Sequence, residues 1–197
     1  MFDSGMTVSD LIVAVNNEID VAITVDNSSY VRWINVAEQM LYGEIIKERK
    51  AVILAEPTSP IALTEIVPSA GELQMIFEDI ATVYADGVEL KKSTLGDNIF
   101  PDTYCKADNK LSVNRADILE LKVIYSVRPA LKTVGNIATD KIMLPYEFLE
   151  LMTSKLRGEA YKLANENTIA ANWLNDYNVL VENFKIWVEN KAARFGV

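Results

Sequence analysis

Few side chains in this sequence could carry out chemistry. The chain contains no histidine and a single cysteine, Cys105. The commonest general base and metal ligand is therefore missing, and a nucleophilic thiol would have no imidazole to activate it. Glycines occur singly, so no glycine-rich loop can hold a phosphate, and no serine lies in a nucleophile-elbow context. The sequence predicts neither catalytic nor cofactor-binding residues, and we expect Cys105 to be a partly buried structural thiol.

Carboxylates are the remaining candidates for a site. Glu78-Asp79, Asp108 and Asp117 could form a catalytic pair or a calcium cage. However, Asp108-Asn109 followed by Asn114 and Asp117 lacks the ligand spacing and the fixed glycine of a calcium loop. We therefore expect a solvated hairpin at Asp108-Asn109 and no bound metal.

Composition narrows the function classes further. The chain has 197 residues, of which 50% are hydrophobic and 24% charged, and its net charge is −9. This charge opposes non-specific adhesion to nucleic acid, which needs clustered lysine and arginine. No window approaches the roughly 18 apolar residues of a membrane span, and the first residues lack the features of a signal peptide. We expect a cytoplasmic protein with one or two hydrophobic cores.

Two helices open the expected fold. Apolar residues recur at helical spacing over residues 7–19, with Thr7 and Asp10 placed as a capping box. After the capping side chains of residues 26–29, a second helix is expected over about residues 30–48. A small basic cluster is interpreted as the solvated end of this helix, where it favours the helix dipole: Lys47, Arg49 and Lys50.

From about residue 51 the apolar residues no longer follow helical spacing and instead alternate with polar ones. Asp86-Gly87 between two alternating runs is the strongest hairpin signal, and Asp108-Asn109 repeats it more weakly. Nearby prolines favour edge strands over a central parallel sheet. About four to six antiparallel strands are expected, drawn from residues 51–55, 61–67, 80–85, 88–91, 103–106, 110–113 and 119–127.

Two more helices end the sequence. Pro145 stands at the start of the third, and residues 165–168 form a short turn before the fourth. The fourth helix carries a heptad-like aromatic seam, which we interpret as packing against other helices rather than as a ligand box. The seam consists of Trp173, Tyr177, Leu180, Phe184 and Trp187.

These elements predict an α+β fold. Residues 1–50 and 130–197 are expected to form a helical bundle from N- and C-terminal helix pairs. Residues 51–129 are expected to form a small antiparallel β insertion, with linkers at residues 55–60 and 130–140.

Four short motifs occur in a characteristic order. They are Val31-Arg32-Trp33-Ile34-Asn35, the Asp-Gly hairpin of residues 83–90, the strand of residues 121–129 that ends in Arg-Pro, and Leu144-Pro145-Tyr146-Glu147-Phe148. In these motifs and their order, the chain resembles the head-to-tail adaptor (connector, head-completion) proteins of tailed bacteriophages over nearly its whole length.

The resemblance implies a structural virion protein and not an enzyme. Such a subunit forms a homo-oligomeric ring of about twelve copies beneath the portal protein. The ring binds a stopper or tail-tube protein on its other side, in a virion neck assembled in the host bacterial cytoplasm. DNA passes through the lumen during ejection without sequence-specific binding, and no membrane is involved. The acidic composition suits this role, because an electronegative lumen repels the duplex.

The resemblance also implies a portal contact at the C-terminus. Related adaptors reach the portal with this segment, which here offers Lys191 and Arg194 as charge partners and Phe195 as an apolar anchor. The apolar seam of the last helix ends after Val188, so residues 190–197 are expected to be mobile until they dock.

Two other functions stay open. A tail-completion or tail-terminator ring would be favoured by a lone β-barrel with one helix. A carbohydrate-binding or hydrolytic virion module would be favoured by exposed coplanar aromatic rings, for which the β insertion offers Tyr84, Tyr104 and Tyr125.

Overall fold

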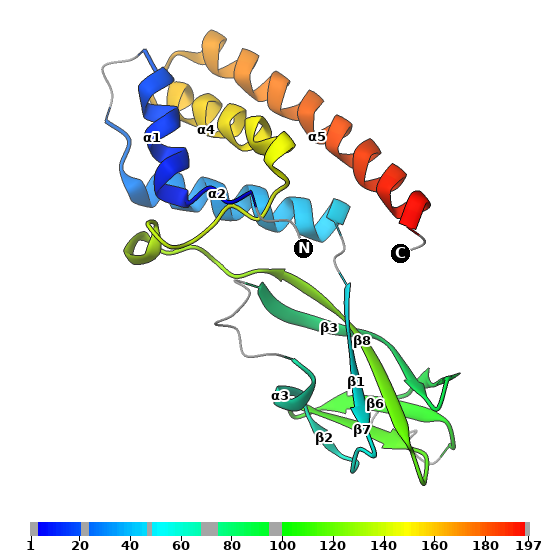
Figure 1. The fold of residues 1–197 in the computed structure, drawn as a ribbon. Coiled ribbons are helices and arrows are strands. Elements are labelled where there is room, and N and C mark those ends of the chain that lie inside the picture. Colours follow the sequence, from blue (N-terminus) through cyan, green and yellow to red (C-terminus); the bar gives the residue numbers. More distant parts are fainter. Residues whose placement is uncertain (1–3, 21–23, 47–48, 68–74, 95–99, 196–197) are drawn as a thin grey trace. The chain divides into compact units, whose positions relative to one another are not determined.

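The computed structural model describes residues 4–20, 24–46, 49–67, 75–94 and 100–195. For residues 192–195 it describes the backbone and not the side chains. As predicted, the fold is α+β, with helices from both ends of the chain and strands between them (Figure 1). The chain divides into a helical unit, Met1–Ile46 with Pro129–Val197, and a β unit, Lys47–Arg128. The β unit thus begins at Lys47, four residues before the expected residue 51, and ends at Arg128, one residue before the expected residue 129.

The N-terminal helices begin where their capping residues predict. Helix α1 spans Val8–Glu18, and both hydrogen bonds of the capping box between Thr7 and Asp10 are present. Helix α2 spans Asn27–Leu41, and the Asp26 carboxylate accepts a hydrogen bond from the Ser29 N–H at 2.9 Å.

The α-helical part of the second helix ends at Leu41. The chain continues from there as a wider π-helical turn, η1, over Tyr42–Ile46, and the last two residues of the expected helix, 47 and 48, lie outside the described residues. Gly43 and the β-branched pair Ile45-Ile46 weaken the α-helix there. Lys47 lies outside the described residues, and Arg49 and Lys50 belong to a strand rather than to a helix end.

The C-terminal helices form a close pair. Pro145 precedes a 3₁₀ turn, η3 (Tyr146–Phe148), which leads into α4 (Leu149–Leu163); α5 follows over Asn167–Phe195. A Cβ atom on Gly158 would lie 2.7 Å from Leu174, so the two helices approach closely there.

The aromatic seam of the last helix packs within the helical unit. The rings of Phe148 and Phe184 are 4.7 Å apart, and Phe184 and Trp187 are stacked at 5.9 Å. Phe184 is fully buried and Tyr177 nearly so. The predicted packing role of the seam is therefore confirmed.

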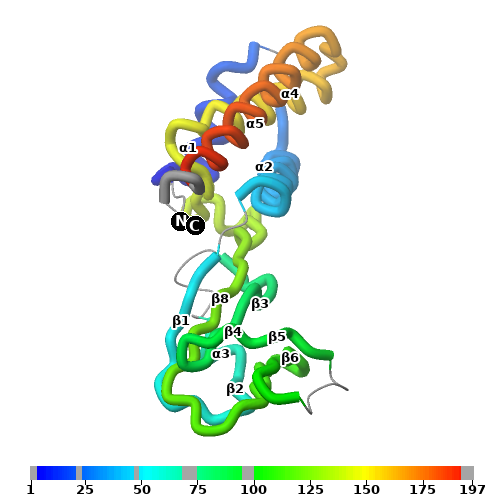
Figure 2. The backbone as a smooth tube through the Cα atoms, turned by 90° about the vertical axis from the view of Figure 1, so that its right-hand side faces the viewer, coloured from blue at the N-terminus to red at the C-terminus, as the bar shows by residue number. Residues whose placement is uncertain are grey.

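The β unit contains two four-stranded sheets among its described residues (Figure 2). The first has the order β1-β8-β3-β4, and the second β2-β7-β6-β5. Their bounds are β1 Arg49–Ala55, β2 Ile61–Ala62, β3 Met75–Ala85, β4 Val88–Glu89, β5 Lys91–Lys92, β6 Thr103–Ala107, β7 Lys110–Asn114 and β8 Glu120–Pro129. Strand β5 runs parallel to β6, which departs from the all-antiparallel expectation.

Both predicted hairpin turns are confirmed. Asp86 and Gly87 have φ angles of 49° and 79°, and Asp108 and Asn109 have 49° and 58°. Two consecutive positive φ angles are the signature of the type I′ turn, whose twist matches that of paired strands. The predicted strand over residues 61–67 is wrong, because only Ile61–Ala62 pairs and Leu63–Ile66 forms the short helix α3.

Candidate interaction surfaces

Residues 129–144, here called the strap, lead from β8 to the C-terminal helix pair and are held on α2. The Asn35 amide donates to the Lys132 carbonyl at 3.0 Å and accepts from the Lys132 N–H at 2.8 Å. The Gln39 amide donates to the carbonyl of Pro129 at 2.8 Å. Residues 130–140, expected as a linker, thus belong to the helical unit and are held on α2. Side chains of α2 replace the hydrogen bonds that water would otherwise supply.

A buried ion pair lies beneath the strap. The Glu38 carboxylate is 3.3 Å from the Lys132 ammonium, and its other oxygen accepts a hydrogen bond from the Met143 N–H at 2.8 Å. Burial raises the pKa of Glu38, although the charge of Lys132 opposes that shift. The pair thus ties both halves of the strap to α2.

Sequence reasoning did not identify this pair. Glu38 follows Ile34 by one helical turn, so it lies on the apolar face of α2, where an acid is an anomaly that signals a buried partner. Lys132 gave no comparable signal, because it stands in a segment without periodicity.

A second charged cluster joins three helices of the same unit. Arg157 of α4 forms ion pairs with Glu18 at the end of α1 and, at 3.4 Å, with Glu150. Its guanidinium also lies 4.5 Å from the ring centre of Trp173 on α5. Trp173 therefore serves packing within the helical unit.

The three residues suggested for portal contact lie on α5. The helical backbone continues to Phe195, beyond Val188, where the apolar seam was expected to end. Glutamate, lysine, alanine and arginine dominate this stretch and are good helix formers without an apolar seam. Lys191 is exposed, with its ammonium 4.7 Å from the Trp187 ring centre. The side chains of Arg194 and Phe195 lie outside the described residues.

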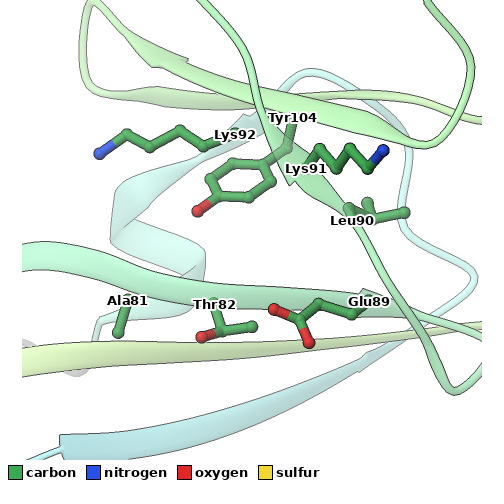
Figure 3. A pocket seen from close by; sticks show the side chains of 7 residues that line it. All are labelled: Ala81, Thr82, Glu89, Leu90, Lys91, Lys92 and Tyr104. Carbon is green, nitrogen blue, oxygen red and sulfur yellow. The ribbon is translucent and has the colours of Figure 1, made fainter.

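An open pocket of about 550 Å³ lies between the two sheets of the β unit. Figure 3 shows β3 and β4 on one side and β5 and β6 on the other, with Tyr104 projecting between them. The ammonium groups of Lys91 and Lys92 point in opposite directions, so their charges do not converge on one point. The lining residues are Ala81, Thr82, Glu89, Leu90, Lys91, Lys92 and Tyr104.

The remaining site candidates occupy structural positions. Cys105 is 3% exposed within β6. Tyr104 and Tyr125 are 3% and 2% exposed and Tyr84 is half-buried, so two of the three candidate rings are not available to an exposed sugar-binding platform. Across the described ranges no group of three or more cysteine, aspartate and glutamate side chains could hold a metal ion.

Exposed apolar side chains mark surfaces where partners could bind. Val36 on α2 and Leu131 and Val134 on the strap are 59%, 63% and 48% exposed. The element that contains Val134, η2 (Val134–Asn136), packs against α2. Exposed apolar side chains on elements that pack together suit contacts with other protein chains.

None of the helices in the described part of the chain is long and apolar enough to cross a bilayer. Comparison with family models and with curated protein sequences finds no match to this chain.

Proposed function

We propose that this chain is a head-to-tail adaptor subunit from the neck of a tailed bacteriophage. In this proposal, copies of the chain close a ring beneath the portal, extend the DNA channel and dock a stopper or tail-tube protein below. The observation that carries the proposal is the order of elements: a helix pair, a β unit inserted after it, and a second helix pair that joins the first.

The motifs of the resemblance support the proposal because each has a fold-defining role. In the first motif Ile34 is fully buried, and Asn35 holds the strap. In the hairpin motif the Asp86 carboxylate accepts hydrogen bonds from the N–H groups of Leu119 and Glu120, at 3.0 and 2.9 Å.

The two later motifs stand where the chain enters its next element. Pro129 ends the third motif, and its carbonyl is fixed by Gln39. In the fourth motif Leu144 is fully buried directly before Pro145, which opens the turn into α4. A motif that sets the course of the backbone is more informative about fold than one on a surface.

The structural features that separate the alternatives favour the adaptor. A tail terminator was expected to have a lone β-barrel with one helix, whereas two helix pairs frame this β unit in sequence. A sugar-binding module is expected to expose coplanar aromatics, whereas two of the three candidate rings, Tyr104 and Tyr125, are buried and Tyr84 is half-buried.

Charge and exposed apolar surface also fit a ring that conducts DNA. The net charge of −9 would make the channel electronegative and keep the duplex from adhering. Val36, Leu131 and Val134 provide apolar surface for contacts between protein chains, without which a ring cannot close.

The test is binding to portal rings from the same phage. Purified chain is mixed with portals, sedimented through a density gradient and imaged by electron microscopy. We expect the chain to co-sediment and to add one ring of density at a single end of the portal, while chain alone stays at the top of the gradient. Absence of binding at both low and physiological salt would contradict the proposal.

A further inference from the structure

An apolar stripe runs along the exposed face of helix α5. The helix packs on α4 and η1, and Figure 1 shows α4 between α5 and α1. Val179 and Ile186 are 60% and 55% exposed. Each stands two positions after a buried ring, Tyr177 or Phe184, so it points to the opposite side of the helix. The seven residues between them place both valine and isoleucine on one face, two turns apart.

Acids border this apolar stripe. Residues three or four positions from Val179 or Ile186 are their neighbours on the helix surface. All six of these neighbours are exposed, three are acids and none is a lysine or an arginine. They are Asn175, Asp176, Glu182, Asn183, Glu189 and Asn190. We call the two apolar residues and these neighbours the α5 stripe. Two α5 stripes would repel each other, so the charges disfavour pairing of this face with its own copy.

Helix α2 presents the complementary surface. Val36 is exposed, and Arg32 stands one helical turn before it and is exposed as well. The structure describes every residue of α2, and the other charged residue of this helix, Glu38, is buried. None of the described residues forms an ion pair with Arg32. The exposed surface of α2 therefore offers an apolar side chain, a positive charge and no acid.

We propose that α5 of one copy of this chain docks onto α2 of the next copy, with Val36 seated between Val179 and Ile186 and Arg32 beside the acids of the α5 stripe. The contact covers three aliphatic side chains that otherwise face water. It also places the exposed cation of α2 against an acidic surface, as charge complementarity between protein chains requires.

The spacing on α5 fits one side chain of a facing helix. Residues at positions i, i+3, i+4 and i+7 form the hole that receives such a side chain. On α5 these positions hold Val179, Glu182, Asn183 and Ile186. An arginine one turn from the inserted valine meets an acid in either direction of the partner helix, because acids border both ends of the α5 stripe.

The contact joins different faces of the two copies. Each copy therefore keeps one face for a further neighbour, and a heterologous contact of this kind closes into a ring when the rotation between copies allows it. Both helices belong to the helical unit, so the contact needs nothing from the β unit. The inference rests on the ring of the proposed function and names the surfaces that build it.

Cross-linking between two variants gives the first test. A chain with Val36→Cys is mixed with a chain with Ile186→Cys at about 1 mM, to cover weak association, and treated with a short bis-maleimide. We expect the product that joins residues 36 and 186 to dominate, as identified by peptide mass. Cys105 is buried and does not compete for the reagent. Val13→Cys, at a similarly exposed valine of α1, replaces Val36→Cys in the matched control and should give about fivefold less product.

Charge exchange gives the second test. Arg32→Glu, added to the Val36→Cys chain, sets an acid against the α5 stripe and should lower the yield about three- to fivefold, and more at low salt. Glu182→Arg, added to the Ile186→Cys chain, should then restore the yield to within about twofold. Glu147→Arg, the same change at an exposed position outside α5, is the matched control and should not restore it. All these positions are exposed, so the circular dichroism spectrum should stay that of the original chain.

The outcomes separate this contact from the adaptor function. The same cross-linking is repeated on chain bound to portal rings. If the product joining residues 36 and 186 is missing from both free and bound chain, the contact is overturned, and where portals still bind, the adaptor function stands. The product in a chain that binds no portal supports the contact and contradicts the adaptor function. A dominant product between two copies of residue 186, or a yield that Glu182→Arg does not restore, also overturns the contact, because either result places the α5 stripe against another surface.

Discussion

The Lys132 ammonium lies 3.3 Å from the Glu38 carboxylate, and both side chains are almost completely shielded from solvent. Moving either charge out of water is costly, and their mutual attraction offsets that cost only while both are present. The pair therefore specifies where the strap lies on α2, and it makes this part of the fold intolerant of single changes.

Removing one member of the pair should be strongly destabilising. Glu38→Ala leaves the Lys132 ammonium buried without its partner, so we expect the free energy of unfolding to fall by about 3–5 kcal/mol. Urea denaturation followed by tryptophan fluorescence measures this change.

Removing both charges provides the control. Glu38→Leu combined with Lys132→Met replaces the pair by apolar side chains, and this double variant should be more stable than Glu38→Ala, because no unpaired charge remains. A double variant as unstable as the sum of its two single variants would show that the charges do not interact.

The Asp26 carboxyl group, which caps the N-terminus of α2, should titrate at low pH. Hydrogen bonds from the Ser28 hydroxyl, the Ser29 N–H and the Ser29 hydroxyl hold the pKa of Asp26 at about 2, below its ordinary 3.8. A lowered pKa means that Asp26 contributes stability above pH 3.8, and that this contribution is lost as the pH falls through about 2. Carbon-detected NMR titration measures the pKa directly.

Asp26→Asn distinguishes the cap from its charge. Asparagine also caps helices well but does not ionise in this range. The stability difference between the original chain and Asp26→Asn should therefore shrink as the pH is lowered below about 4. A difference that stays constant from pH 5 to about pH 2 would contradict the assignment.

The close approach of α4 and α5 predicts an unfavourable glycine substitution. Alanine at position 158 would gain about 1 kcal/mol of helix propensity. Its Cβ atom would nevertheless lie 2.7 Å from the Leu174 side chain and 3.3 Å from the Leu174 backbone nitrogen. Overpacking of this kind costs about 1–3 kcal/mol, so we expect Gly158→Ala to lower the melting temperature.

Gly43 supplies the matched control. A Cβ atom at Gly43 would meet nothing within 4 Å, so Gly43→Ala should leave the melting temperature unchanged or raise it slightly. Gly158→Ala combined with Leu174→Ala should relieve the steric part of the loss, and failure to do so would place the cause elsewhere.

Features that depend on adjacent residues could be predicted from the sequence. The capping box of Thr7 and Asp10 and the Asp86-Gly87 turn involve residues at most three positions apart, whose side-chain and backbone preferences act locally. The apolar periodicity predicted the helix pairs for a similar reason, since one helical turn is enough to define a face.

Features set by distant residues could not be predicted. Leu63–Ile66 reads as a strand because its apolar residues are β-branched or aliphatic, yet only Ile61–Ala62 finds a strand partner, in β7. The strap reads as a linker because it has no period, and its order depends on Asn35 and Glu38 far away in the chain. The parallel pairing of β5 with β6 likewise follows from which strand lies beside it.

The C-terminal segment provides the sharpest test of the proposed portal contact. Removing residues 190–197 shortens α5 beyond Phe184, the last fully buried side chain that the structure describes on this helix, and deletes Lys191, whose ammonium lies over the Trp187 ring. An exposed contact between a cation and an aromatic ring contributes about 0.5–1 kcal/mol, so the melting temperature should fall by no more than about 4 °C. Binding to portal rings should nevertheless be lost, because a weak contact repeated around a ring becomes strong through effective concentration.

A charge variant asks which part of this segment matters. Lys191→Glu combined with Arg194→Glu keeps the helix length and reverses two positive charges, so we expect weaker co-sedimentation with portals. The loss of binding relative to the original chain should be larger at low salt, where charge interactions are screened less. Lys162→Glu, at an exposed position near the end of α4, is the matched control and should bind portals like the original chain. If the truncated chain still bound portals as tightly as the full one, the C-terminal contact would be wrong. The β unit would then be the better candidate for the portal-facing surface, because the truncated chain would bind portals with the affinity of the full chain.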